Sequence, residues 1–126
     1  MVEIRSINHV SLLVADTDRA LDFYHGMLGL SIDDSRPALD FPGAWLKVGD
    51  GQIHLLELLK SGAPEERPEH GGRDAHLAMN VVDLDKVVHA LETAGIAYTQ
   101  SRSGRKALFC RDPDGNALEL IEATSA

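Results

Sequence analysis

Two copies of one unit make up this chain, and the internal repeat limits the possible folds more than any other feature of the sequence. The segment His-Val-Ser-Leu-Leu-Val-Ala-Asp from His9 aligns with His-Leu-Ala-Met-Asn-Val-Val-Asp from His76. Further along, Gly-Gln-Ile-His-Leu-Leu-Glu-Leu from Gly51 aligns with Asn-Ala-Leu-Glu-Leu-Ile-Glu-Ala from Asn116. The repeat therefore predicts two similar supersecondary units.

The spacing of the aligned residues accounts for the whole length of 126 residues. His76 follows His9 by 67 residues (76 − 9), and Glu119 follows His54 by 65 residues (119 − 54). We expect one domain over 1–126, which divides into a first module (4–59), a polar linker with Pro and Gly (60–73) and a second module (74–123).

Each copy has the pattern of a strand, a helix and three further strands. Asp16 and Asp83 precede the apolar periodicity of a helix, and Gly29 and Gly95 follow it, as expected for helix caps. Strands are expected at 4–15, 30–34, 44–48 and 52–59, and again at 75–82, 96–100, 106–111 and 117–122, with the second helix at 84–94. The sequence predicts an α+β fold of tandem βαβββ modules.

The charge of the chain disfavours two classes of partner. Twenty acidic residues against twelve basic ones give a net charge of −8, which repels nucleic-acid phosphates and anionic membrane surfaces. No apolar run is long enough to span a bilayer, and the first six residues lack the pattern of an export signal. We expect a cytoplasmic protein with a small-molecule substrate. Cys110, the single cysteine, is expected to be a buried strand residue.

Four residues of metal-binding type occupy equivalent positions in the two copies. His9 and His76 lie at matching positions on the opening strands, and His54 and Glu119 lie at matching positions on the closing strands. Three imidazoles and one carboxylate suit one divalent transition metal ion: zinc, nickel, iron, cobalt or manganese. Coordination positions left to water or substrate favour catalysis over a closed structural site.

The choice of the fourth residue depends on strand geometry. His54 and Glu57 are three residues apart, so a strand directs them to opposite faces. The repeat aligns His54 with Glu119 and Glu57 with Glu122, which selects His54 for the metal site. We expect the two remaining glutamates to be solvated. The other histidines, at positions 25, 70 and 89, are expected to lie at the surface.

These residues and motifs resemble the vicinal oxygen chelate superfamily, which includes glyoxalases, bleomycin-resistance proteins and extradiol dioxygenases. The resemblance rests on Asn-His-Val-Ser at the opening strand, Leu-Asp-Phe-Tyr in the first helix and Asp-Pro-Asp-Gly-Asn-Ala-Leu-Glu-Leu from Asp112. It implies that each module is an incomplete barrel, and that paired modules enclose a U-shaped metal cleft. It places the three commonest ligands at His9, His76 and Glu119, and it implies a homodimer.

The resemblance also indicates the chemistry. The segment from Arg36 to Ile-His-Leu-Leu looks like that of a glyoxalase-I-like branch, with His54 where glyoxalase I has a further metal-binding glutamate. Leu13 stands where that enzyme commonly has an arginine for glutathione. We expect a lyase or isomerase whose substrate chelates the metal through vicinal oxygens. The metal would act as a Lewis acid, and Glu119 or a metal-bound water would transfer the proton.

Several other readings of the sequence remain open. An extradiol-type dioxygenase uses a site of two histidines and one carboxylate, which His9, His76 and Glu119 can supply. A metal-free protein of bleomycin-resistance type would bind a small molecule in the cleft without chemistry. A member that keeps a metal only for assembly would turn over nothing. The basic residues Arg73, Arg105 and Lys106 could bind an anionic substrate, but we expect each of them to be solvated.

Overall fold

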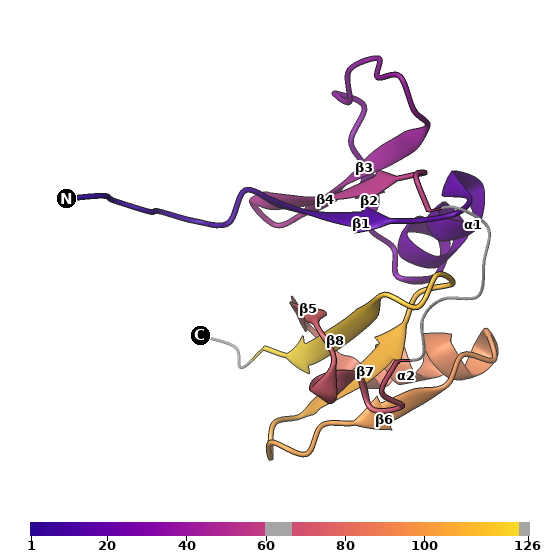
Figure 1. Ribbon diagram of the computed structural model, residues 1–126. Coiled ribbons are helices and arrows are strands. Elements are labelled where there is room, and N and C mark those ends of the chain that lie inside the picture. The colour runs from indigo at the N-terminus through magenta and orange to yellow at the C-terminus, as the bar shows by residue number, and fades with distance from the viewer. Residues whose placement is uncertain (60–66, 124–126) are drawn as a thin grey trace. The chain divides into compact units, whose positions relative to one another are not determined.

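The computed structural model describes residues 1–59 and 67–123 (Figure 1). Two compact units, Met1–Ser61 and Gly62–Ala126, divide the chain. Each unit contains one four-stranded sheet. Residues 60–66, the first half of the expected linker, lie outside the described residues. In the described part of the chain, no helix is both long and apolar enough to cross a membrane.

The first unit has the expected element order. Its elements are β1 (His9–Leu13), α1 (Thr17–Leu21), the π-helical turn η1 (Asp22–Met27), β2 (Ser31–Ile32), β3 (Gly43–Val48) and β4 (Gly51–Leu56). The strand order in the sheet is β1-β4-β3-β2. The opening strand β1 runs parallel to the closing strand β4, and the other pairs are antiparallel.

The second unit repeats this topology. Its elements are the 3₁₀ turn η2 (Gly71–Arg73), β5 (His76–Val81), α2 (Leu84–Thr93), β6 (Tyr98–Gln100), β7 (Ala107–Arg111) and β8 (Ala117–Glu122). The order is β5-β8-β7-β6, with β5 parallel to β8. The α+β class and the tandem βαβββ modules are therefore confirmed, and both sheets are open.

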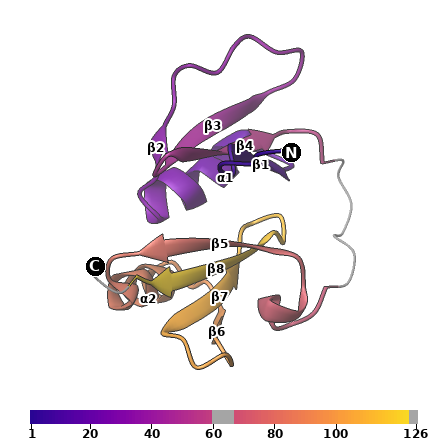
Figure 2. The same ribbon diagram turned by 90° about the vertical axis from the view of Figure 1, so that its left-hand side faces the viewer.

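Each sheet buries one face under its own helix. In the first unit Leu46, Ile53 and Leu55 are at most 1% exposed, and α1 contacts β3 and β4. In the second unit Leu108 and Leu118 are equally buried, and α2 contacts β8 (Figure 2). Because side chains alternate along a strand, the residues between these positions point to the opposite, open face. That open face holds the residues of metal-binding type.

The first predicted strand is too long. Residues 4–8 are apolar in part, but the ladder between β1 and β4 begins at the pair His9 and Gln52, because the partner strand starts at Gly51, directly after the turn from β3. Ile4 and Ile7 are consequently exposed, at 87% and 80%. A strand needs a partner for its backbone groups, which composition alone does not reveal.

The two glutamates excluded from the metal site are not simply solvated. Glu57 accepts a hydrogen bond from the backbone N–H of Thr17 (2.8 Å), and Glu122 accepts one from that of Leu84 (3.1 Å). Both N–H groups belong to the first residue of a helix, where no intrahelical acceptor exists. The closing strand of each unit therefore anchors the helix that follows the opening strand. The sequence-based expectation of solvated carboxylates was wrong.

The Leu84 N–H and, after it, the Lys106 ammonium lower the pKa of Glu122 below its usual 4.5. A carboxyl group whose pKa is lowered by folding stabilises the folded state above its unfolded pKa. That contribution is lost as the pH falls through the folded-state pKa, so the anchor of α2 weakens in acid.

Replacement of Glu57 by alanine tests this structural role. The variant leaves the Thr17 N–H without its acceptor, so we expect the free energy of unfolding to fall by about 1 kcal/mol. Urea denaturation at neutral pH measures the change. Glu3→Ala, in the exposed N-terminal segment, is the matched control and should leave stability unchanged. Equal stability of the two variants would contradict the anchor.

Candidate functional site

His76 and Glu119 meet on the open face of the second sheet. They lie on the parallel neighbours β5 and β8, and Nε2 of His76 is 3.3 Å from Oε1 of Glu119. Glu119 is only 7% exposed within the chain. Phe109 pairs with Glu119 in the ladder and packs its ring edge-on against His76, with centroids 5.0 Å apart. A buried carboxylate and an imidazole thus share one apolar wall.

A hydrogen bond at Nδ1, the ring nitrogen that does not face Glu119, fixes the orientation of the His76 ring. Nδ1 of His76 donates a hydrogen bond to the backbone carbonyl of Asp74 (2.9 Å). Because a carbonyl only accepts, Nδ1 carries a proton, and in the neutral ring the lone pair of Nε2 faces the Glu119 carboxylate. Two acceptors at this distance repel each other unless a second proton or a metal cation lies between them. An imidazole held by a backbone carbonyl is the arrangement typical of metal-binding histidines.

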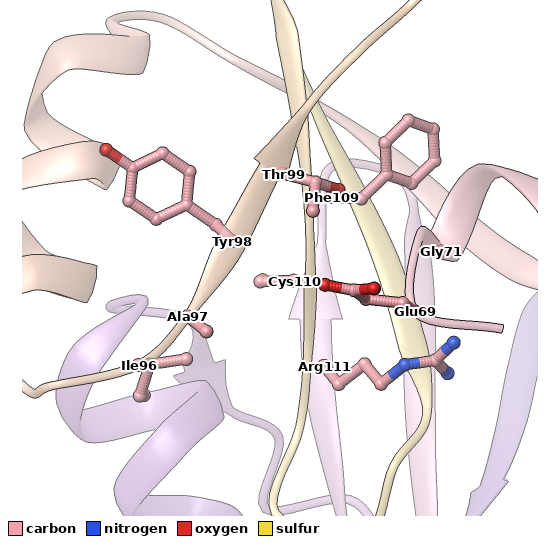
Figure 3. Close-up of a pocket in the computed structure, with 9 residues that line it drawn as sticks. All are labelled: Glu69, Gly71, Ile96, Ala97, Tyr98, Thr99, Phe109, Cys110 and Arg111. Carbon is pink, nitrogen blue, oxygen red and sulfur yellow. The ribbon is translucent and has the colours of Figure 1, made fainter. Parts of the chain in front are cut away.

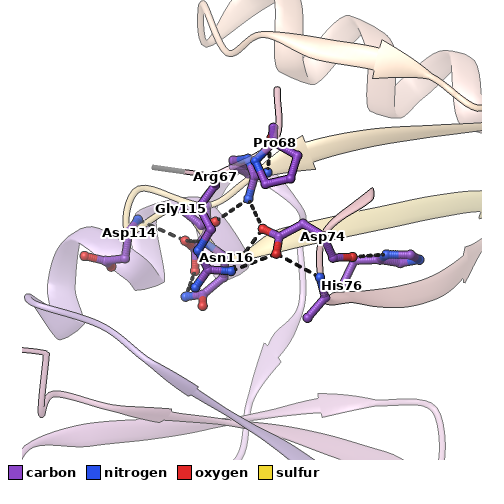
Figure 4. A network of polar contacts seen from close by, with 10 residues as sticks. Arg67, Pro68, Asp74, His76, Asp114, Gly115 and Asn116 are labelled. Carbon is purple, nitrogen blue, oxygen red and sulfur yellow. Dashed lines mark hydrogen bonds and ion pairs between the residues drawn. The ribbon is translucent and has the colours of Figure 1, made fainter. Parts of the chain in front are cut away.

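Arg111 holds the segment that carries this carbonyl, and Figure 4 labels its partners Pro68, Asp74 and Gly115. It donates from Nη1 to the Asp74 carboxylate (2.9 Å) and to the Gly115 carbonyl (2.8 Å), and from Nη2 to the Pro68 carbonyl. The hydrogen bond from Arg111, and then that from Arg67, keeps the pKa of Asp74 low. One guanidinium therefore joins the start of β5 to the turn that leads into β8.

His9 and His54 meet on the open face of the first sheet. Their rings stack with centroids 3.9 Å apart and an interplanar angle of 14°. Trp45, the ladder partner of His54, stacks on its other side at 4.1 Å and 5°. Trp45 thus has the same place beside His54 that an aromatic ring has beside Glu119 in the second unit. The repeat extends to the apolar wall of each pair.

Hydrogen bonds fix which nitrogen of each ring is available. Nδ1 of His9 donates to Oδ1 of Asn8 (2.7 Å), which leaves Nε2. Nε2 of His54 donates to Oε1 of Gln52 (2.8 Å), whose amide donates to Asp33 (2.7 Å), so Nδ1 of His54 remains. Burial, followed by the nearby charges of His9 and Arg36, lowers the pKa of His54. A lowered pKa favours the neutral ring, which is the form that binds metals.

The stacked rings limit how one ion is shared. The lone pair of an imidazole nitrogen lies in the plane of its ring, and the two planes are only 14° from parallel. Nearly parallel rings with centroids 3.9 Å apart do not direct their lone pairs to one ion about 2.0–2.1 Å from both nitrogens. If His9 and His54 bind the same metal, one ring must turn out of the stack.

The structure brings the predicted site residues together in two pairs, one in each unit. Among residues 1–59 and 67–123, no three His, Cys, Asp or Glu side chains form a group that could hold a metal ion. Each pair provides two of the four predicted ligands, and the complete site stays a prediction.

A cavity of about 440 Å³ opens beside the second pair. Its lining residues come from η2, β5, β7, β8 and the loop after β6: His70, Gly72, Arg73, His76, Ser101, Arg102, Ser103, Arg105, Phe109 and Glu119. His70, expected at the surface, is half-buried here, because its Nδ1 lies 2.7 Å from the Thr99 hydroxyl and its ring packs on Phe109. The repeat gave no signal for His70, since the linker has no counterpart in the first copy.

A second cavity, of about 330 Å³, lies at the β6 edge of the same unit (Figure 3). It is mostly apolar and is lined in part by Ile96, Tyr98 and Cys110. Burial, together with the charge of Asp112, raises the pKa of the Cys110 thiol to about 12. Cys110 is a buried strand residue, as expected, and its thiol is not a nucleophile at neutral pH.

Comparisons with known proteins agree with this geometry. Residues 6–120 match the family model described as Glyoxalase/Bleomycin resistance protein/Dioxygenase superfamily. "Glyoxylase I 4" of Arabidopsis thaliana is 33% identical over 98% of this chain and 74% of that protein. "Glutathione transferase FosA" of Serratia marcescens is 30% identical over 93% of this chain and 80% of its own length.

One solved structure shows the same fold with a ligand. It is a mutant of the fosfomycin resistance protein FosX from Listeria monocytogenes, complexed with Mn(II) and 1S,2S-dihydroxypropylphosphonic acid. The TM-score is 0.75 at 15% identity, and the match covers 97% of this chain and 95% of that chain.

Alkylation of the single cysteine tests the pKa argument. At pH 8 a thiol with a pKa of about 12 is almost entirely protonated. We expect iodoacetamide to modify native Cys110 roughly 10³-fold more slowly than the urea-unfolded chain, where the pKa is about 8.5. Mass spectrometry over time measures both rates, and similar rates in the two states would contradict the burial of the thiol.

Proposed function

The chain belongs to the glyoxalase/bleomycin resistance protein/dioxygenase superfamily, and on this premise we propose that it is a metal-dependent lyase or isomerase. Its substrate is a small molecule that chelates the metal through two neighbouring oxygens. The metal is one divalent transition ion, bound by His9, His54, His76 and Glu119. A bound metal would supply Lewis-acid stabilisation of a developing negative charge on the substrate.

The contact between His76 and Glu119 carries the proposal. The two side chains place a nitrogen lone pair and a carboxylate oxygen 3.3 Å apart beside a cavity, with Glu119 buried and His76 open to solvent. Imidazole and carboxylate are ligands of zinc, iron, nickel, cobalt and manganese, so the chemistry of the donors fits such an ion. The carbonyl behind Nδ1 holds the ring for this purpose without occupying the binding nitrogen.

Glu119 is proposed as the group that moves the proton. One of its oxygens faces His76, and a carboxylate has a second oxygen that can accept a proton from the substrate. Phe109 and the neighbouring strand limit the access of water to it, since Glu119 is only 7% exposed. Sparse hydration strengthens the interaction of the carboxylate with charges near it.

The structural relative supports both parts of the proposal. The FosX structure is described as containing Mn(II), a divalent transition ion, together with a compound that has hydroxyl groups on adjacent carbons. A ligand of that kind offers two neighbouring oxygens. For this chain, we extend the comparison to the class of metal and to the chelating pattern, and the substrate itself is a separate question.

We propose a homodimer as the working assembly. The two pairs of ligands lie on separate units of the chain, so a complete site needs His9 and His54 from one unit beside His76 and Glu119 from another. Within a homodimer, these two units can come from the same chain or from the two copies of the chain.

Metal content tests the proposal. Protein purified without chelator and reconstituted with Zn²⁺, Ni²⁺, Co²⁺, Mn²⁺ or Fe²⁺ should hold close to one equivalent per chain by elemental analysis. Replacement of His76 by alanine or of Glu119 by glutamine should remove most of it, because each loses a ligand. His89→Ala, on the exposed face of α2, is the matched control and should bind as the native chain does.

The outcomes separate the alternatives. Negligible metal after reconstitution would contradict the proposal and favour a metal-free binding protein. If both His76→Ala and Glu119→Gln retain the metal, the metal binds elsewhere in the protein. A weaker variant, Arg111→Gln, should lower metal affinity about 10-fold, since the support of the Asp74 carbonyl behind His76 is lost.

A further inference from the structure

Three arginines gather around the cavity that holds His76 and Glu119. Arg73 ends the η2 turn, and Arg102 and Arg105 lie on the loop between β6 and β7. Of the described residues that line this cavity, Glu119 alone is acidic. The protein as a whole carries a net charge of −8, with only twelve basic residues. The cavity, with three guanidinium groups, is therefore locally positive, although the net charge of the protein is negative.

These arginines are not used by the fold. Arg67 and Arg111 in the same unit bind the Asp74 carboxylate. For Arg73, Arg102 and Arg105, no ion pair with a carboxylate is present within the described ranges 1–59 and 67–123. Their side chains are exposed, so their charges remain available to a ligand.

The loop that carries two of the arginines is folded on itself. The hydroxyls of Ser101 and Ser103 are 2.8 Å apart, and the backbone N–H of Ser103 donates to Ser101 Oγ (3.2 Å). Gly104 then turns the chain with a φ of 84°, a conformation that favours glycine. The turn places Arg102 and Arg105 on the same cavity together with two hydroxyl groups, which also bind anionic oxygens.

We propose that this cavity binds an oxyanion group, a carboxylate or a phosphoryl group, on the part of the substrate that does not chelate the metal. Guanidinium groups pair with both kinds of oxyanion through two parallel hydrogen bonds. A volume of about 440 Å³ suits a small molecule. The substrate is then a small acid: its neighbouring oxygens lie at His76 and Glu119, and its charged end lies at the arginines. The assignment of the two ends rests on the proposed function.

Titration of the metal-free protein with inorganic phosphate and with acetate tests the site independently of metal binding. Backbone amide signals of Ser103 and Arg105 in two-dimensional NMR report on the cavity, at ionic strength held constant with chloride. We expect saturable shifts with at least one of the anions. The stronger of the two identifies a phosphoryl or a carboxylate group.

Single variants locate the binding. Arg73→Ala, Arg102→Ala and Arg105→Ala should each weaken the anion about two- to five-fold, as expected for exposed charges. Lys86→Ala, which removes an exposed positive charge from α2 and does not line the cavity, is the control and should change nothing. No saturable shift with either anion, or the same loss in Lys86→Ala as in the arginine variants, would overturn the proposal. Failure of metal binding alone would leave this result intact.

Discussion

The parallel pairing of the opening strand with the closing strand is the interaction on which the rest of each unit depends. It places β1 beside β4 and β5 beside β8, although some forty residues separate the partners along the chain. Alternation of side chains along each strand then sends the leucines to the helix and the polar residues to the open face. The stack of His9 on His54 and the contact of His76 with Glu119 are direct results of this one ladder.

The same closing strands serve structure and site at once. Three residues after His54 comes Glu57, which anchors α1 from the opposite face of β4, and Glu122 follows Glu119 in the same relation to α2. A shift of register by one residue would exchange the anchor and the ligand, so the helix contacts protect the geometry of the site. Arg111 adds a second support in the C-terminal unit alone.

The repeat in the sequence predicted much of this structure. It predicted the topology of both units, the bounds of β8 and the opposite faces of His54 and Glu57, whereas His54 as a metal ligand stays a prediction. It missed what has no counterpart in the other copy: the packing of His70 on Phe109 and the role of Arg111. It also missed the helix anchors Glu57 and Glu122. The sequence around a strand glutamate does not reveal which backbone N–H group donates a hydrogen bond to it.

In the proposed site, the two copies of the repeat share one metal ion. X-ray absorption spectroscopy of the protein loaded with one equivalent of Zn²⁺ tests it most directly, because the scattering of imidazole rings counts histidine ligands. We expect three imidazoles and one carboxylate, with Zn–N distances of about 2.0–2.1 Å. A single imidazole bound to the metal would contradict a shared ion. So would a spectrum that stays the same after both His9 and His54 are replaced by alanine.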